Sequence, residues 1–160
     1  MAVNEKRPHI FVLSEDEANR KILIGFVQGV DKNPRQIQAL RFNRGKSDVL
    51  EDFIKVYVGK LRDYNKSFVV LLLDFDENVR FRDQILEHVP EEVRDQVFVI
   101  GAPDEPEHLR RVLGDFETIG QNLARDCRDN TQITWGHDLL KHNLEELARM
   151  PPDVRSILFD

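Results

Sequence analysis

Residues 67–73, Ser-Phe-Val-Val-Leu-Leu-Leu, form an apolar run that stops at the acidic sequence Asp74-Phe75-Asp76-Glu77. A run of this length without polar alternation is typical of a strand that is covered on both faces. Strands of this kind lie in parallel sheets, because the crossover helices between parallel strands pack on both faces of the sheet. The run therefore predicts a central strand of an α/β fold.

Three further apolar runs predict the remaining strands of the sheet, at residues 9–14, 36–42 and 96–101. Amphipathic segments with apolar residues at helical spacing lie between the runs. In the first two segments the apolar positions are Ile22, Leu23, Phe26, Val27 and Val30, and Val49, Leu50, Phe53, Ile54, Tyr57 and Leu61. Strands that alternate with helices predict right-handed βαβ units and a four-stranded, mainly parallel sheet flanked by helices.

The pattern changes after Gly101, where helix-like segments follow one another with only a weak strand-like run at residues 132–135. Three segments there predict helices, at residues 105–113, 116–127 and 139–150. We interpret residues 1–102 as the α/β core and residues 103–160 as a helical extension packed on that core. A chain of 160 residues has the length of a single domain.

Composition limits the expected partners and compartment. No apolar run approaches the roughly 20 residues that a membrane-spanning helix needs, so no membrane association is expected. Cys127 is the single cysteine, and a chain without an internal disulfide suits the reducing cytoplasm. The formal net charge of −6 predicts weak affinity for nucleic acid when the chain acts alone, since phosphate binding relies on basic faces. A protein partner would supply the missing affinity.

Acidic residues follow two of the expected strands. Glu15 comes directly after residues 9–14, and Asp74 and Asp76 come after residues 67–73. Ligands of open parallel sheets bind beyond the carboxyl ends of the strands, so these carboxylates meet if the two strands are neighbours. In an extended Asp-x-Asp segment both aspartates point to the same side. Converging carboxylates repel one another unless a hard cation neutralises them, and Mg²⁺ or Mn²⁺ is the expected cofactor.

A structural explanation competes with the metal site. Acidic residues are favoured at the N-termini of helices, so residues 15–17, Glu15-Asp16-Glu17, could instead start the first helix. Asp74 and Asp76 could likewise start the helix that follows residues 67–73. Each cluster alone fits capping as well as it fits metal binding. The presence of both clusters, each after an apolar strand, favours the metal site.

Further charged residues follow the second and fourth strands. Arg44 and Lys46 could reach phosphate oxygens at the same edge of the sheet, or they could form a solvated turn before a helix. Asp104, Glu105 and Glu107 could add a metal ligand, or they could begin a helix whose first turn contains Pro106.

Two short segments resemble the motifs of Toprim domains. Val12-Leu13-Ser14-Glu15 places a glutamate at the end of the first strand, and Leu71-Leu72-Leu73-Asp74-Phe75-Asp76 is similar to the hydrophobic Asp-x-Asp motif of that family. The resemblance covers residues 9–101 and implies a core of four parallel strands. It also implies Mg²⁺-dependent phosphodiester chemistry on nucleic acid, as in a nuclease, with Glu15, Asp74 and Asp76 as metal ligands. One of these carboxylates would act as a general base.

Lys46 belongs to this resemblance as well. It closes the sequence Asn43-Arg44-Gly45-Lys46, which is similar to a Gly-Lys segment of small stand-alone bacterial Toprim relatives. The resemblance implies that Lys46 positions or neutralises phosphate.

Two alternatives stay open. The first strand and its acidic pair also resemble a two-component receiver domain, which implies Mg²⁺ at Glu15 and Asp16 and phosphorylation of Asp74. A receiver needs a fifth strand, and the sequence shows none after Gly101. The other alternative is a Toprim-like fold that acts as a non-catalytic interaction module. Asp16 favours this module, because Toprim domains usually have a glycine at that position.

Overall fold

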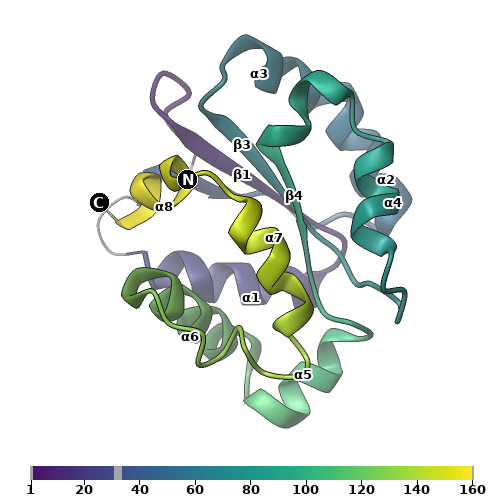
Figure 1. Ribbon diagram of the computed structural model, residues 1–160, viewed down its shortest axis with the longest axis vertical. Coiled ribbons are helices and arrows are strands. Elements are labelled where there is room, and N and C mark those ends of the chain that lie inside the picture. Colours follow the sequence, from purple (N-terminus) through teal and green to yellow (C-terminus); the bar gives the residue numbers. More distant parts are fainter. Residues whose placement is uncertain (1, 31–33, 160) are drawn as a thin grey trace.

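Four parallel strands form the sheet at the centre of the computed structural model, which describes residues 2–30 and 34–159 (Figure 1). The strands are β1 (His9–Ser14), β2 (Ile37–Ala39), β3 (Ser67–Leu72) and β4 (Val97–Ile100). Their order across the sheet is β2-β1-β3-β4, and each pair of neighbours is parallel. The predicted α/β fold and its four-stranded parallel sheet are confirmed.

Strand β2 is shorter than the predicted run of residues 36–42. Only Ile37, Gln38 and Ala39 pair with β1. The chain then moves away from the regular ladder, although the Leu40 and Asn43 N–H groups still donate to carbonyls of β1 at 3.1 and 2.9 Å. Residues 41–45 therefore form a loop alongside the end of β1.

One face of the sheet is covered by the helices between β2 and β4 (Figure 1). These elements are α2 (Lys46–Asp52), a π-helical turn (Phe53–Tyr57), α3 (Val58–Asp63), α4 (Phe81–Glu87) and a 3-10 helix (Glu91–Gln96). Alternate strand residues such as Leu13, Leu71 and Val99 pack against Phe53 and Leu61 of these helices. Both faces of β3 are thus buried, as its uninterrupted apolar sequence predicts.

The other face is covered by helices from both ends of the chain. These elements are α1 (Glu17–Gln28), α5 (Pro106–Leu113), α6 (Phe116–Asp129) and α8 (Pro152–Phe159), with a 3-10 turn (Pro34–Gln36) before β2. Helices α1 and α6 approach each other closely. A Cβ atom at Gly25 would lie 2.0 Å from the Glu117 carbonyl oxygen, and one at Gly120 would lie 1.9 Å from that of Ile22. Two glycines therefore set the distance between these helices.

The extension predicted for residues 103–160 contacts β4, one of the two outer strands of the sheet. The segment 139–150, predicted as one helix, divides into a 3-10 turn (Lys141–Asn143) and α7 (Leu144–Arg149). The weak strand-like run at 132–135 is a turn, because Asp126 accepts the N–H groups of Thr134 and Trp135 at 2.7 and 3.0 Å.

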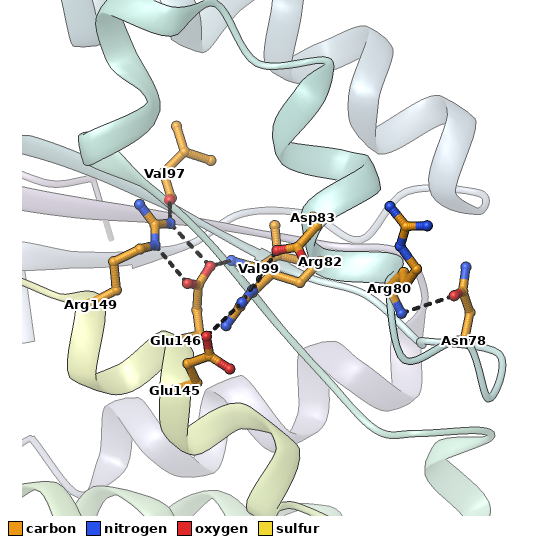
Figure 2. Close-up of polar contacts among 9 residues, drawn as sticks. All are labelled: Asn78, Arg80, Arg82, Asp83, Val97, Val99, Glu145, Glu146 and Arg149. Carbon is orange, nitrogen blue, oxygen red and sulfur yellow. Dashed lines mark hydrogen bonds and ion pairs between the residues drawn. The ribbon is translucent and has the colours of Figure 1, made fainter.

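Side chains from this segment occupy the free edge of β4 (Figure 2). The carboxylate of Glu146 accepts the Val99 N–H at 2.7 Å, and Asn143 hydrogen-bonds both the N–H and the carbonyl of Gly101 at 3.1 Å. Arg149 donates to the carbonyl of Val97 and pairs with Glu146 at 2.7 Å. An exposed edge strand is a site for unwanted pairing, and here polar side chains take the place of a fifth strand.

Among residues 2–30 and 34–159, no helix has the length and apolar character needed to span a bilayer.

Candidate divalent-metal site

The strand order defines where a ligand of this sheet is expected to bind. From β1 the chain passes to β2 on one side of the sheet and later to β3 on the other side. The order matches the first four strands of a flavodoxin-like sheet, in which ligands bind at the carboxyl ends of β1 and β3. Glu15 follows β1 directly, and Asp74 lies two residues beyond the end of β3. The two residues therefore meet at the switch point.

Three carboxylates converge there. One oxygen from each of Glu15, Asp16 and Asp74 lies within 4.8 Å of the others. Glu15 and Asp74 are 8% and 9% exposed, so their charges are largely removed from water. Oxygen ligands at this spacing suit a hard divalent cation such as Mg²⁺ or Mn²⁺. The residues present therefore fit the predicted metal.

Hydrogen bonds hold Asp74 in this position. Its backbone N–H donates to Oε1 of Glu15, and its Oδ1 accepts the side-chain amide of Asn19 at 3.1 Å. Burial, together with the negative charges of Glu15 and Asp16, raises the pKa of Asp74 to about 7, against the lowering effects of the Asn19 hydrogen bond and the Lys46 charge. A carboxylate with this pKa is only partly charged near neutral pH, and a bound cation would favour its charged form.

Asp76 lies apart from the three converging carboxylates. The predicted extended Asp-x-Asp segment, with both aspartates on one side, is therefore not formed. The φ angle of Asp76 is 49° and that of Glu77 is 60°, so the backbone turns left-handed at this point. The Asp76 side chain is 72% exposed and forms an ion pair with Lys46 at 2.8 Å. Asp76 is therefore joined to the site through Lys46, and its role as a metal ligand stays a prediction.

Lys46 bridges the two parts of the site. Its Nζ lies 3.4 Å from the carboxylate of Glu15 and 2.8 Å from Asp76. Burial alone would lower the pKa of Lys46, but hydrogen bonds and Coulomb attraction from Asp76 and Glu15 raise it above its ordinary value. Lys46 thus carries a positive charge beside the buried carboxylates. Such a charge balances them and can also bind a phosphate oxygen.

A glycine places Lys46 at the site. Gly45 is the N-cap of α2 with a φ of 100°, a conformation that side chains disfavour. Its N–H donates to the Glu15 carbonyl at 3.0 Å, which ties the start of α2 to the end of β1. The loop before α2 is therefore fixed next to the carboxylates.

The capping explanation holds for one acidic residue. Asp16 is the N-cap of α1, and its Oδ1 accepts the Asn19 N–H at 2.9 Å. Glu15 instead binds the backbone of β3, and α4 begins only at Phe81 with Arg80 as its N-cap. Glu15, Asp74 and Asp76 therefore do not serve as caps.

The acidic residues after β4 lie outside the converging group. Glu105 is the N-cap of α5 without a side-chain capping bond, and Pro106 occupies the first turn, as the helix-start explanation predicts. Asp104 accepts a hydrogen bond from His108 at 2.9 Å. Within residues 2–30 and 34–159, the group with metal-ligand spacing contains only Glu15, Asp16 and Asp74.

Asn19 is the part of the site that the sequence analysis missed. It is almost fully buried and donates to both Asp16 and Asp74, at 3.0 and 3.1 Å. Its position was detectable, because it lies three and four residues before Ile22 and Leu23 on the apolar stripe of α1. A buried amide on such a stripe needs a polar partner.

Comparison with known proteins supplies no relative for this fold and site: no family model, no curated protein and no solved structure matches the chain.

Proposed function

We propose that this protein carries out Mg²⁺- or Mn²⁺-dependent phosphodiester chemistry on nucleic acid, as a Toprim-like nuclease. The observation that supports this most is the convergence of Glu15, Asp16 and Asp74 at the β1/β3 switch point, with Lys46 beside them. Carboxylates that hold a divalent cation next to a lysine are suited to phosphate esters, because the cation and the lysine both bind phosphate oxygens.

Each residue has a distinct task in this proposal. Glu15 and Asp74 hold the cation, and Asn19 orients Asp74. When substrate binds, Lys46 would break its ion pair with Asp76 and bind a phosphate oxygen instead. The released Asp76 carboxylate could then join the cation or accept a proton from the attacking water. A bound cation supplies the positive charge that stabilises the phosphate oxygens as the bond breaks.

A cleavage assay tests the proposal. Labelled DNA and RNA, each single-stranded and double-stranded, are incubated with the protein and Mg²⁺ or Mn²⁺, beside EDTA controls. We expect cleavage by the wild type only with the metal, and a loss of about a hundredfold or more in Asp74→Asn and Lys46→Met. Metal-dependent cleavage that survives Asp74→Asn would mean that the assigned carboxylates are wrong.

One observation favours a receiver-like function as the second candidate. Asp16, and not Asp76, lies with Glu15 and Asp74, which is the set that a receiver would use. In that case an oxygen of the Asp74 carboxylate would attack the phosphorus of a small donor such as acetyl phosphate, and acetate would leave. Glu15 and Asp16 would hold Mg²⁺. Mass spectrometry after incubation with acetyl phosphate and Mg²⁺ distinguishes the two candidates. A phosphoryl group on Asp74 supports the receiver function, and an unmodified Asp74 in a protein that cleaves nucleic acid supports the nuclease.

A further inference from the structure

We infer that the loop before α2 and the N-cap of α4 form a binding surface for single-stranded nucleic acid, with an unpaired base stacked on Phe42. This inference rests on the proposed function, since it assigns the substrate class of the same site. It concerns Arg41, Phe42, Arg44 and Arg80, which we call the rim. None of these residues contributes to the group of converging carboxylates.

The loop that carries Arg41, Phe42 and Arg44 runs past the candidate metal site. Asn43 and Gly45 of the loop donate their N–H groups to the carbonyls of Ser14 and Glu15, at 2.9 and 3.0 Å. The loop therefore runs along the carboxyl end of β1. Arg80 reaches this region from α4. It precedes Phe81 in the chain, and the Nζ of Lys46 lies 5.7 Å from the centroid of the Phe81 ring.

The loop is held in one conformation, which presents its exposed side chains at low entropic cost. The Asn43 side chain donates to Asp48 at 3.3 Å and to Asp52 at 2.6 Å, and the Arg44 N–H donates to Asp48 at 3.1 Å. Arg20 donates to the Leu40 carbonyl at 3.0 Å. A preordered surface loses less conformational freedom when a ligand binds.

The rim arginines are free for phosphate. In the described part of the chain, the guanidinium groups of Arg41, Arg44 and Arg80 form no hydrogen bond or ion pair, and all three residues are exposed. Figure 2 shows the contrast: Arg80 contacts Asn78 only through its backbone N–H, whereas Arg82 pairs with Asp83 and Glu145 at 3.2 Å. Unpaired guanidinium groups near the carboxylate site suit the phosphates of a nucleic-acid backbone.

Phe42 selects the single-stranded form. It is a large apolar side chain with 42% of its surface exposed, and it lies between Arg41 and Arg44 in the sequence. An exposed aromatic ring flanked by arginines is a stacking platform for an unstacked base. Bases in a duplex are already stacked and paired, so they gain little from this ring. The combination of one ring with three arginines therefore favours single strands.

Fluorescence anisotropy with a short labelled oligothymidylate and a duplex of equal length tests the inference. Ca²⁺ replaces Mg²⁺ so that the site is filled while cleavage is suppressed. We expect the wild type to prefer the single strand. Phe42→Leu should lower single-strand affinity roughly tenfold and leave duplex affinity unchanged. Arg41→Ala/Arg44→Ala should weaken both and reduce the salt slope for the single strand by about 1.4, for two lost phosphate contacts.

Lys66→Ala is the matched control, because Lys66 is an exposed cation at the opposite, amino-terminal end of the sheet. It should bind like the wild type. Equal affinity for single strand and duplex, or a Phe42→Leu variant that binds like the wild type, would overturn the inference. A calorimetric titration of Mg²⁺ separates a failure of this inference from a failure of the proposed function. If the wild type binds no Mg²⁺, the metal site is wrong, independently of how the rim variants bind nucleic acid.

Discussion

The carboxylate of Glu15 accepts the backbone N–H of Asp74 at the point where β1 and β3 end. This contact brings a residue from the start of the chain against the Asp-x-Asp segment 59 residues later. Since both side chains are buried, the pair is electrostatically costly without a compensating charge. Lys46 supplies part of that charge from 3.4 Å, and a divalent cation would supply the rest.

Replacement of Asp74 by asparagine should change how stability depends on pH. The pKa of Asp74 in the folded protein is about 7, above its ordinary value of 3.8, so the folded state binds the proton more tightly. The stability contributed by protonation is complete at low pH and is lost as pH rises through the folded pKa. Asp74→Asn cannot ionise, so it should gain stability relative to the wild type between about pH 4 and pH 8, by a few kcal/mol.

Urea unfolding across this pH range, without divalent cations, measures the effect. Asp95→Asn, an exposed aspartate before β4, is the control and should follow the wild type. Parallel stability curves for wild type and Asp74→Asn would show that Asp74 titrates normally.

Glu146→Gln should destabilise the protein strongly. Glu146 is 0% exposed and binds Val99 and Arg149, so the variant leaves a partly buried guanidinium without its counter-charge. The Arg149 side chain is 31% exposed, so water compensates part of the lost charge, and we expect a cost of about 2 kcal/mol. The adjacent Glu145 pairs with Arg82 at the surface, and its carboxylate is 81% exposed.

Glu145→Gln is therefore a matched control, expected to cost less than about 1 kcal/mol. Both variants are compared by denaturant titration. Equal effects of the two substitutions would contradict the assigned role of Glu146 at the edge of β4.

Gly120→Ala should destabilise the contact between α1 and α6. The added methyl group would overlap the Ile22 carbonyl, so the helices must move apart. We expect a loss of about 1–3 kcal/mol, although alanine is the better helix former. Gly59→Ala in α3 has no atom within 4 Å of the new methyl group and should instead be neutral or stabilising. Thermal unfolding compares them, and a stabilised Gly120→Ala would show that the helices are not in close contact.

The sheet could be predicted because its signals are local. The unbroken run 67–73 and the alternation of strands with helices define four parallel strands, and the rule for carboxyl ends then brings Glu15 and Asp74 together. The receiver resemblance named Asp16 beside Glu15 and Asp74, whereas the Toprim resemblance named Asp76. The displacement of Asp76 could not be predicted, because it depends on left-handed backbone angles at Asp76 and Glu77. Such angles are uncommon for residues other than glycine.

The polar side chains at the edge of β4 could not be predicted from the sequence either. Glu145 and Glu146 are neighbours in sequence, and the local pattern does not distinguish the exposed one from the buried one. Only the packing of α7 against β4 decides that Glu146 faces the strand. The hydrogen bonds that position the site and cover the edge of β4 thus join residues far apart in the sequence. Short sequence motifs cannot predict such bonds.

Isothermal titration calorimetry with Mn²⁺ and Mg²⁺ tests the central claim most directly. The wild type and the Asp95→Asn control should each bind a cation, with proton release near neutral pH because Asp74 must ionise. Asp74→Asn should lose this binding, while Lys46→Met should keep it, since Lys46 carries the charge that competes with the cation. Equal binding by wild type and Asp74→Asn, or no binding by the wild type, would contradict a metal site at Glu15, Asp16 and Asp74.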